Sequence, residues 1–444
     1  MIEADPQGSD PNVLDELVEK ESTENAVSVY RNRTEEEIQG VRCLSVEETP
    51  QTVRSALLML SFEISESIPD AQKRAYLRSQ KMPEWYVNDP GFRLRFLRLA
   101  LFDVKKAAWR LVKFLDLILE FFGDRALMRP IRYTDLSTTE RRFMRSGRYQ
   151  ACQRRDESGR RIFTVFPEDD DSQIPPLSKA KIILYLSWAI GDDDIVTQRK
   201  GIVVVVWCDT KNSSSNLPEQ LRCTMEEMAS VRITAIHWCS PDTPLHRLRR
   251  TVTTARCGDE ERSNFRFHLG VAVDLHYALH GYGIPSSEIP VTYTGRIKTR
   301  PFVQWTQIRR AIESPSNDSE DIIVECPQLN DALFRGGKSY TNFAGNKMLR
   351  KMVENYAKSL SHKTRQPRGR RLLALMIFEE CDLVTAGGTK KIGRYLAWDL
   401  TSRWWTVLTD REQIYHKIGY LVREITRELN RSETITRIEP REDC

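Results

Sequence analysis

The stretch Gly201-Ile-Val-Val-Val-Val-Trp-Cys208 decides the fold class of this chain. It is β-branched and apolar on both faces, which is typical of a central strand in a parallel sheet that helices cover on both sides. Two more strands are expected downstream, at residues 231–239 and 265–269. Residues with helical patterns lie between these strands and after the last of them. Strands that alternate with helices predict an α/β domain with a largely parallel sheet.

The remaining elements of this α/β domain, which we place at residues 146–312, follow from the same patterns. A short strand is expected at 160–166. The predicted helices cover residues 177–190, 217–230, 244–253 and 271–280.

A helical region precedes the α/β domain. Its clearest part runs from Leu111 to Phe122, where apolar residues recur at three- and four-residue steps, and Gly123 ends the pattern. Residues 52–62 and 72–80 also have helical patterns. We therefore predict an all-helical lead-in at residues 51–145.

A second, smaller domain is expected after residues 313–320, a polar Ser- and Pro-containing segment that is typical of a linker. The later elements are predicted to be helices at 346–360 and 372–383, hairpin strands at 391–398 and 403–408, and a last helix from residue 409. This order predicts an α+β domain at 321–430, compatible with a winged-helix-like arrangement, followed by a tail at 431–444.

Charge is unevenly distributed along the 444 residues, whose net charge is only +5. Residues 1–50 hold four Lys or Arg against thirteen Asp or Glu, and they contain few aromatic residues. Such a segment buries too little apolar surface to offset its ordering entropy, so we expect an acidic disordered leader. Hydrophobic residues make up 40% of the whole chain, which suits a globular protein.

Cysteine usage and the N-terminus predict an intracellular protein. The nine cysteines are odd in number and form no Cys-x-x-Cys pair, which argues against a disulfide framework and a zinc site. The first residues lack the basic and apolar regions of a signal peptide. The longest apolar runs have about eight residues, whereas a membrane span needs about 18 or more. We expect a cytoplasmic protein, with the nucleus as an alternative.

Catalytic motifs are not evident in the sequence. The tripeptide Gly337-Lys338-Ser339 lacks the earlier glycine of a phosphate-binding loop, because position 332 is Ala332. His276 and His280 share a helical spacing, but no acidic residue stands between them, as the zinc motif His-Glu-x-x-His requires. We therefore predict no enzymatic activity, no metal and no cofactor.

Residues 88–292 resemble the CRAL-TRIO family. The opening Phe92-Arg-Leu-Arg-Phe-Leu-Arg98 looks like the family's helical lead, and Arg155-Asp156 with Gly159-Arg160 matches its "RD-x-x-GR" entry to the lipid domain. The closing Tyr282-Gly283-Ile284-Pro285 stands in the expected order. The resemblance implies a sheet that floors an apolar pocket with a helical gate, in a family that carries phosphoinositides, tocopherol or retinoids between membranes.

The pocket that this resemblance implies needs apolar side chains that face inward. The alternative is that the same side chains fill an ordinary core, since buried apolar strands usually do. The candidate lining residues are Val204, Val206, Ile236, Trp238, Phe267 and Leu269.

Residues 321–424 resemble a small domain of unknown function that is frequent in diatoms and related algae. The matching residues include Arg335-Gly336-Gly337-Lys338, Gly345-Asn346, Gly393-Arg394-Tyr395-Leu396 and Trp404-Trp405. The usual His-Pro before the Gly-Asn pair is Phe343-Ala344 here. No activity follows from this resemblance.

Basic and aromatic residues of this second domain suit an anionic partner, either nucleic-acid phosphates or an anionic membrane surface. A solvated basic surface is the alternative. The candidate residues are Arg335, Lys338, Lys347, Arg350, Arg394 and Trp404.

Two functional hypotheses follow. The first is a lipid-binding or lipid-transfer-like protein with a basic C-terminal interaction domain, which takes a hydrophobic lipid as ligand. The second is a nucleic-acid-binding or regulatory protein that keeps a degenerate CRAL-TRIO domain as a scaffold. The oligomeric state does not follow from the sequence.

Overall fold

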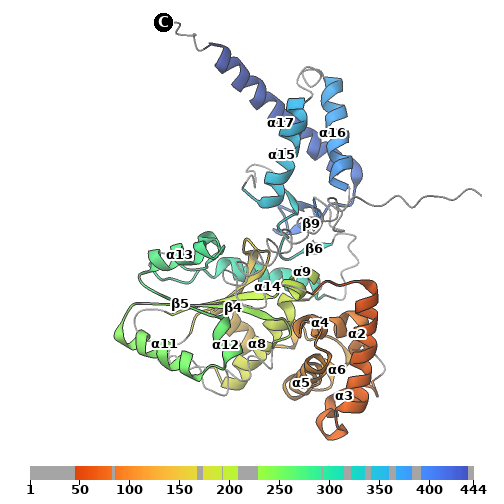
Figure 1. Cartoon of the computed structure of the whole chain (residues 1–444), viewed down its shortest axis with the longest axis vertical. Helices are drawn as coiled ribbons and strands as arrows, with labels where there is room; N and C mark the ends of the chain where they lie inside the picture. The colour runs from red at the N-terminus through yellow and green to blue at the C-terminus, as the bar shows by residue number, and fades with distance from the viewer. Residues whose placement is uncertain are drawn as a thin grey trace, which may run out of the picture. The chain divides into compact units, whose positions relative to one another are not determined.

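A computed structural model describes residues 46–82, 86–167, 174–192, 194–208, 229–292, 294–314, 322–335, 342–359, 367–382 and 392–438. The chain divides into two compact units, which we describe separately (Figure 1). Unit 1 comprises Met1–Ile131, Phe163–Ser286 and Tyr293–Gly295, and unit 2 comprises Arg132–Ile162, Ser287–Thr292 and Arg296–Cys444. Most of the expected acidic leader and the expected helix at 217–230 lie outside the described residues.

Unit 1 begins with helices, as the sequence predicts. Asp89 starts one of them, because its carboxylate accepts a hydrogen bond from the Phe92 amide. Asp103 caps the next helix through the Lys106 amide, and Gly123 ends it with a φ of 72°. These helices are α2 (Pro50–Phe62), α3 (Arg74–Ser79), α4 (Pro90–Leu99), α5 (Val104–Phe122) and α6 (Arg125–Met128), with shorter turns at Glu63–Ser67, Asp70–Gln72 and Tyr86–Asn88.

Arg95 joins this helical region to the rest of unit 1. Its guanidinium is buried, lies 3.8 Å from the ring centroid of Trp188, and donates hydrogen bonds to the Trp188 carbonyl at 2.5 Å and to the Ser230 hydroxyl at 2.9 Å. The rings of Phe92 and Phe114 also pack against Trp188. A buried cation needs such partners, so the helical region and the α/β region share one core.

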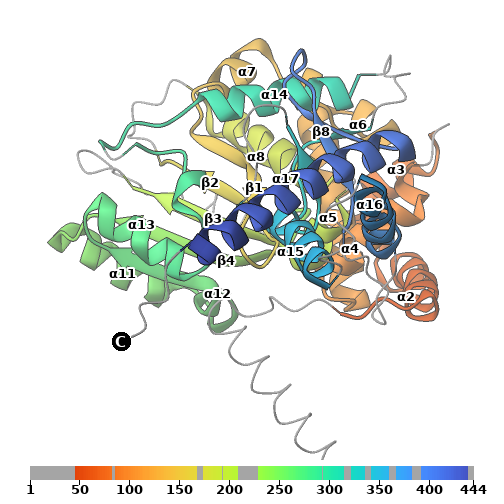
Figure 2. The ribbon, with the colours of Figure 1, turned by 90° about the horizontal axis from the view of Figure 1, so that it is seen from above.

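The parallel sheet of unit 1 forms from the strands β3 (Ile202–Trp207), β4 (Ile233–Ser240) and β5 (Phe265–Leu269). β3 and β4 run side by side in Figure 2, and β2 (Arg161–Val165) neighbours β3. Gly201 precedes β3 with a φ of 78°, and a Cβ there would lie 2.6 Å from the Arg232 carbonyl oxygen. Only glycine fits this approach of the two chains.

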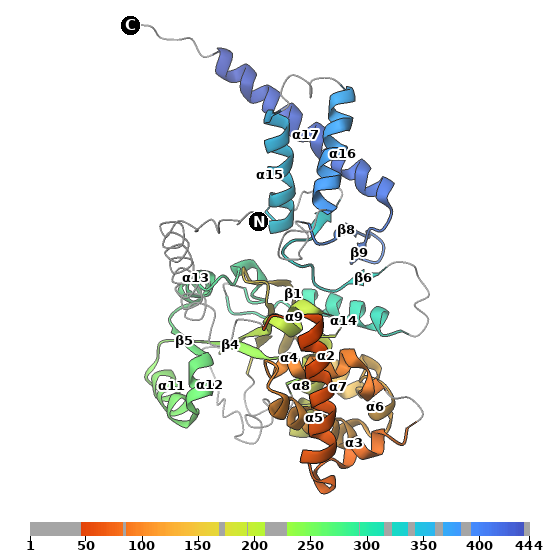
Figure 3. The same ribbon diagram turned by 45° about the vertical axis from the view of Figure 1, so that its right-hand side comes forward.

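Helices cover both faces of this sheet. In Figures 1 and 3, α13 lies on one side of β4 and β5, and α11 and α12 lie on the other. The predicted alternation of parallel strands and helices is therefore confirmed. The helices of this region are α8 (Pro176–Ile190), α9 (Ile195–Lys200), α11 (Pro244–Arg256), α12 (Asp259–Asn264) and α13 (Ala272–Gly281).

Unit 2 combines two groups of elements. The first consists of η4 (Tyr133–Asp135), α7 (Thr138–Met144), β1 (Tyr149–Arg155) and α14 (Arg300–Ile312). The second is a sheet in the order β6-β9-β8-β7 with three helices, which Figure 3 shows as a bundle. Its elements are β6 (Ile323–Val324), β7 (Ala332–Phe334), α15 (Ala344–Ser359), α16 (Pro367–Asp382), β8 (Tyr395–Trp398), β9 (Trp405–Val407) and α17 (Arg411–Ile438).

The helices and the hairpin of this second group were predicted from the sequence, whereas β6 and β7 were not. Both strands are very short, and β7 pairs in parallel with β8, so neither leaves a local alternation pattern. The observed sheet thus adds two strands, one of them parallel, to the expected hairpin. The sequence analysis also missed β1 and α14.

A buried carboxylate lies at the centre of unit 2. Glu325 accepts hydrogen bonds from Arg161 at 2.5 Å, from the Trp305 ring nitrogen at 2.6 Å and from Arg309 at 3.1 Å. Burial alone would raise the pKa of this carboxyl, but the charges of the two arginines lower it below its ordinary value. The ion pairs balance the cost of burying all three charges.

The same network includes residues on both sides of the predicted linker at 313–320. Glu313 pairs with Arg309 at 2.9 Å and accepts a hydrogen bond from the Tyr133 amide at 2.6 Å, so the start of the expected linker is anchored. Glu325, beyond the expected linker, binds Arg309 before it. Both sides of this segment therefore belong to unit 2. Residues 315–321 lie outside the described part of the chain.

Replacing Glu325 tests the importance of the network. Glu325→Gln removes the buried carboxylate that pairs with both Arg161 and Arg309, so we expect a loss of about 3–5 kcal/mol in the free energy of unfolding, measured by urea denaturation. The matched control is Glu354→Gln, which removes a partly exposed partner of Arg350 and should cost less than about 1 kcal/mol. Equal losses in the two variants would contradict a central role for Glu325.

No helix in the described ranges combines the length and the apolar character that crossing a membrane requires.

Candidate functional site

Strand register places the six predicted lining residues on one face of the parallel sheet. Val204 pairs with Ile236, and Trp238 pairs with both Val206 and Phe267. Leu269 follows Phe267 two residues later on the same strand. Residues in register share a face, because side chains alternate along each strand. We call the surface formed by Val204, Val206, Ile236, Trp238, Phe267 and Leu269 the apolar face.

Burial changes across the apolar face. Val204 and Val206 on β3 are fully buried, whereas the residues on β4 and β5 are only partly buried. Aromatic rings make up this second part: Trp238 and Phe267 have ring centroids 6.4 Å apart, and Phe265 stacks on Phe267 at 5.7 Å. The β5 end of the apolar face is thus an aromatic surface that solvent partly reaches.

Helix α11 lies on the same side as the apolar face. The guanidinium of Arg250 is 5.9 Å from the ring centroid of Phe267. Thr243 caps the helix by accepting a hydrogen bond from the His246 amide, and His246 is the residue of α11 that is buried. This arrangement turns the opposite side of the helix toward solvent.

The outer side of α11 is apolar. Leu245, Leu248 and Val252 are 55%, 60% and 40% exposed, and their spacing places them in one stripe. Leucines on the solvent side of an isolated surface helix gain nothing from burial. An exposed stripe of this kind is typical of a surface that meets another apolar phase or a partner.

Basic residues accompany the stripe. The helix carries Arg247, Arg249, Arg250 and Arg256 and has no Asp or Glu. Asp242, just before the helix, pairs with Arg247 at 2.6 Å. α11 therefore combines exposed leucines with net positive charge.

The opposite face of the sheet is closed by histidines. Nδ1 of His237 lies 3.0 Å from Nε2 of His268, the two rings stack, and Tyr282 packs edge-on against both. Burial and the nearby charge of Arg266 lower the pKa of His268 to about 4. Among the described residues, no three His, Cys, Asp or Glu side chains are placed to hold a metal ion. His276 packs on Trp207.

Two of the predicted basic residues of the C-terminal region are bound to carboxylates. Arg394 makes two hydrogen bonds to the buried Asp331, at 2.8 and 3.2 Å. Arg350 pairs with Glu354 at 3.3 Å and also with Glu428. These ion pairs join segments of the C-terminal region. They also neutralise the charges of Arg350 and Arg394 that we expected to attract an anionic partner.

The other predicted residues of this region are dispersed. The guanidinium of Arg335 lies 4.5 Å from the ring centroid of Trp398, Lys347 is exposed on α15, and Trp404 is partly buried just before β9. Lys338 lies outside the described residues. The described residues do not bring these side chains together into one site.

Comparison with protein-family models gives no match, and comparison with curated proteins also gives none.

The His237–His268 pair should make stability depend on pH. The folded pKa of His268, about 4, lies below its ordinary value of 6.5, so the unfolded chain takes up this proton first as the pH falls. The stabilisation is complete above pH 6.5 and is lost as the pH falls toward 4. Since solvent partly reaches the ring, we expect a loss of about 1–2 kcal/mol.

Urea denaturation between these pH values measures the effect. His268→Gln keeps a hydrogen-bonding group without the titration, and it should flatten this part of the profile. His280→Gln, which changes an exposed histidine of α13, should keep the profile of the unmodified chain. A profile that His268→Gln leaves unchanged would assign the pH dependence to other groups.

Proposed function

We propose that this protein binds a lipid at the apolar face and meets anionic membranes through α11. One observation carries the proposal: the exposed stripe of Leu245, Leu248 and Val252 lies on the helix that covers a partly buried aromatic sheet surface. The same helix would take part in both membrane binding and lipid entry, since it lies between solvent and the apolar face.

α11 has the composition of a helix that binds a membrane interface. An amphipathic helix with leucines on one side and arginines beside them lies in the plane of a membrane interface. Each large apolar side chain that leaves water contributes about 1.5–3 kcal/mol, and each Lys or Arg near an anionic surface contributes about 1 kcal/mol. The two leucines and the arginines of α11 are together sufficient for measurable binding.

The apolar face has a closed part on β3 and a part on β4 and β5 that solvent reaches. Val204 and Val206 form a closed floor, whereas Trp238 and Phe267 border it with aromatic surface that is not fully packed. A lipid chain could replace the solvent beside these rings if α11 moved outward. This follows the CRAL-TRIO resemblance, in which a helix gates the pocket.

The "RD-x-x-GR" motif supports the fold part of the proposal but says little about the ligand. Asp156 accepts hydrogen bonds from the Ser158 and Arg160 amides and from the Arg160 side chain. The motif therefore builds the turn between β1 and β2. This role is structural and does not depend on which ligand the domain binds.

Nucleic-acid binding has less support. It requires the basic residues of the C-terminal domain to face a common phosphate backbone. Arg350 and Arg394 are instead neutralised by carboxylates of the same domain.

Membrane binding through α11 is tested by co-sedimentation with phosphatidylcholine vesicles that contain phosphatidylserine. We expect binding that weakens with salt and falls at least tenfold in Leu245→Glu/Leu248→Glu, because each leucine withdrawn from the interface costs about 1.5 kcal/mol or more. The matched control, Leu400→Glu, changes an exposed leucine between β8 and β9 and should bind normally. Equal binding by all three proteins would refute the role of α11.

Lipid loading is tested on the freshly purified full chain by native mass spectrometry with organic extraction. We expect a lipid at about one per chain, and Val206→Phe should lower its occupancy by filling space over the apolar face. Val205→Phe overfills the other face of the same strand and is the matched control, with a similar loss of stability but normal loading. A protein that stays empty after incubation with mixed vesicles would overturn lipid binding.

A further inference from the structure

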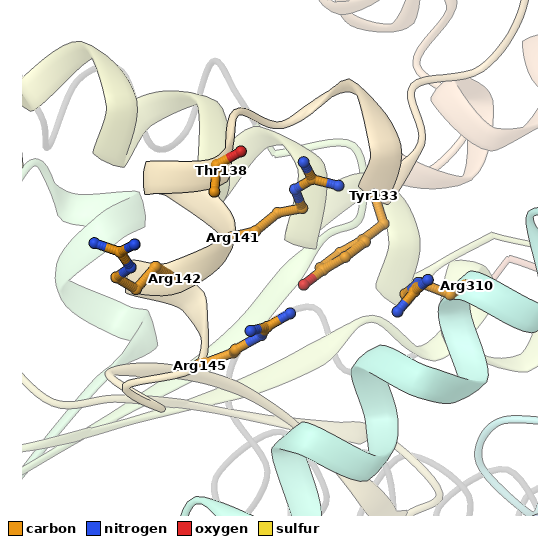
Figure 4. A pocket seen from close by; sticks show the side chains of 6 residues that line it. All are labelled: Tyr133, Thr138, Arg141, Arg142, Arg145 and Arg310. Carbon is orange, nitrogen blue, oxygen red and sulfur yellow. The ribbon is translucent and has the colours of Figure 1, made fainter.

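A pocket in unit 2 is lined almost entirely by arginines. Its residues come from η4, α7 and α14, and its volume is about 360 Å³, within the range of small-molecule sites (Figure 4). We call it the arginine pocket. It is lined by Tyr133, Thr138, Arg141, Arg142, Arg145 and Arg310.

The sequence brings three of these arginines together on one short helix. Arg141, Arg142 and Arg145 lie on α7 or directly after it, and a spacing of four residues places Arg141 and Arg145 on the same side. Figure 4 shows Tyr133 between Arg145 and Arg310, with Arg141 beside it and Arg142 turned away from the other three guanidinium groups. The centre of the pocket is therefore formed by Arg141, Arg145 and Arg310, and Arg142 lies at its rim.

Acidic residues near the pocket are engaged elsewhere. Glu140 is buried and forms a capping box with Ser137, accepting a hydrogen bond from the Ser137 amide at 2.7 Å. Glu313 accepts hydrogen bonds from Arg309 and from the Tyr133 amide. No acidic residue lines the pocket. Within the described residues, Arg142, Arg145 and Arg310 form no ion pair with a carboxylate.

The contrast between Arg309 and Arg310 is informative. Arg309 is buried and is bound by Glu313 and Glu325, so it serves the interior of unit 2. Arg310, the next residue on α14, is exposed and lines the pocket. The nearby carboxylates therefore pair with Arg309, whereas the guanidinium of Arg310 lines the pocket.

Converging cations without counter-charges favour an anionic ligand. Guanidinium groups bind phosphate oxygens with two parallel hydrogen bonds, and they keep their charge at any physiological pH. Tyr133 and Thr138 add hydroxyl groups to the lining. Since three guanidinium groups face one space, a ligand with a single negative charge would leave part of their repulsion uncompensated.

We propose that the arginine pocket binds a compact ligand that carries two or more phosphate groups. Arg141, Arg145 and Arg310 hold the phosphates, and Arg142 contributes long-range attraction from the rim. This chemistry is found both in soluble polyphosphorylated molecules and in polyphosphorylated lipid headgroups. The proposal is independent of lipid binding at the apolar face, because it uses no residue of that face.

The test is isothermal titration calorimetry of the full chain with inositol hexakisphosphate and, separately, with tripolyphosphate. We expect saturable binding of one ligand per chain, weakened at higher salt because ion contacts are screened. Sulfate at the same ionic strength should bind at least tenfold more weakly. Failure of the folded chain to bind either polyphosphate in a saturable manner would overturn the proposal.

Substitutions locate the binding. Arg145→Gln and Arg310→Gln should each weaken binding about tenfold, as expected for the loss of one charged contact, and Arg145→Lys should lie between Arg145→Gln and the unmodified chain because it keeps the charge without the two-pronged contact. The matched control is Arg427→Gln, an exposed arginine of α17 in the same unit, which should bind normally. Circular dichroism verifies folding. Binding that survives Arg145→Gln/Arg310→Gln unchanged would place the ligand elsewhere and refute the proposal.

A vesicle-capture experiment distinguishes a lipid headgroup from a soluble ligand. Phosphatidylcholine vesicles with 5% of a bisphosphorylated phosphatidylinositol are offered to the Leu245→Glu/Leu248→Glu variant, so that α11 does not contribute. Capture by these vesicles, lost in Arg145→Gln/Arg310→Gln, assigns the pocket to a lipid headgroup. Binding of free inositol hexakisphosphate without vesicle capture assigns it to a soluble ligand, and either result supports the polyphosphate chemistry.

Discussion

The carboxylate of Glu325 joins segments of unit 2 that are far apart in the sequence. It accepts hydrogen bonds from Arg161 at the start of β2 and from Trp305 and Arg309 on α14, and it directly follows β6. This buried carboxylate is shared by two arginines, so its loss would remove two ion pairs at once. The positions of α14 and of the small sheet within unit 2 are therefore coupled. The arginine pocket depends on the same network, since α14 supplies Arg310.

The parallel sheet of unit 1 has two unlike faces. Stacked histidines and Tyr282 close one face, and their packing is completed by α13. The other face carries valines at its centre and aromatic rings toward β5, beneath α11. The strand pattern alone cannot distinguish these faces, because every residue of β3 is buried. It is the burial along β4 that distinguishes them, because Ile236 and Trp238 are partly buried whereas His237 and Cys239 on the opposite face are buried.

Much of the fold could be predicted from local patterns, whereas the sites depended on contacts that no local pattern contains. β3 and β5 were evident because β-branched or alternating residues fill them, and α5 because its apolar residues recur at helical spacing. β6 and β7 were not evident, since two or three residues carry no periodicity.

The six apolar-face residues were named from a family resemblance and do share a face. Arg141 and Arg145 were missed because their significance depends on Arg310, some 165 residues later, and on where Glu140 and Glu313 point. The basic C-terminal residues were named from charge alone, which cannot reveal that Asp331 and Glu428 already bind two of them.

Arg95 has a consequence for how unit 1 folds. Its guanidinium stacks on Trp188 and donates to the Ser187 and Trp188 carbonyls near the end of α8, so the helix α4 adds hydrogen bonds to those that the end of α8 makes by itself. Without α4, the Ser187 and Trp188 carbonyls lose a charged donor, and without α8, Arg95 loses both these acceptors and the Trp188 ring. The two regions therefore belong to one cooperative folding unit, and opening of the helical region would expose the end of α8 as well. Native-state hydrogen exchange in α4 and α8 would then report a single shared opening event.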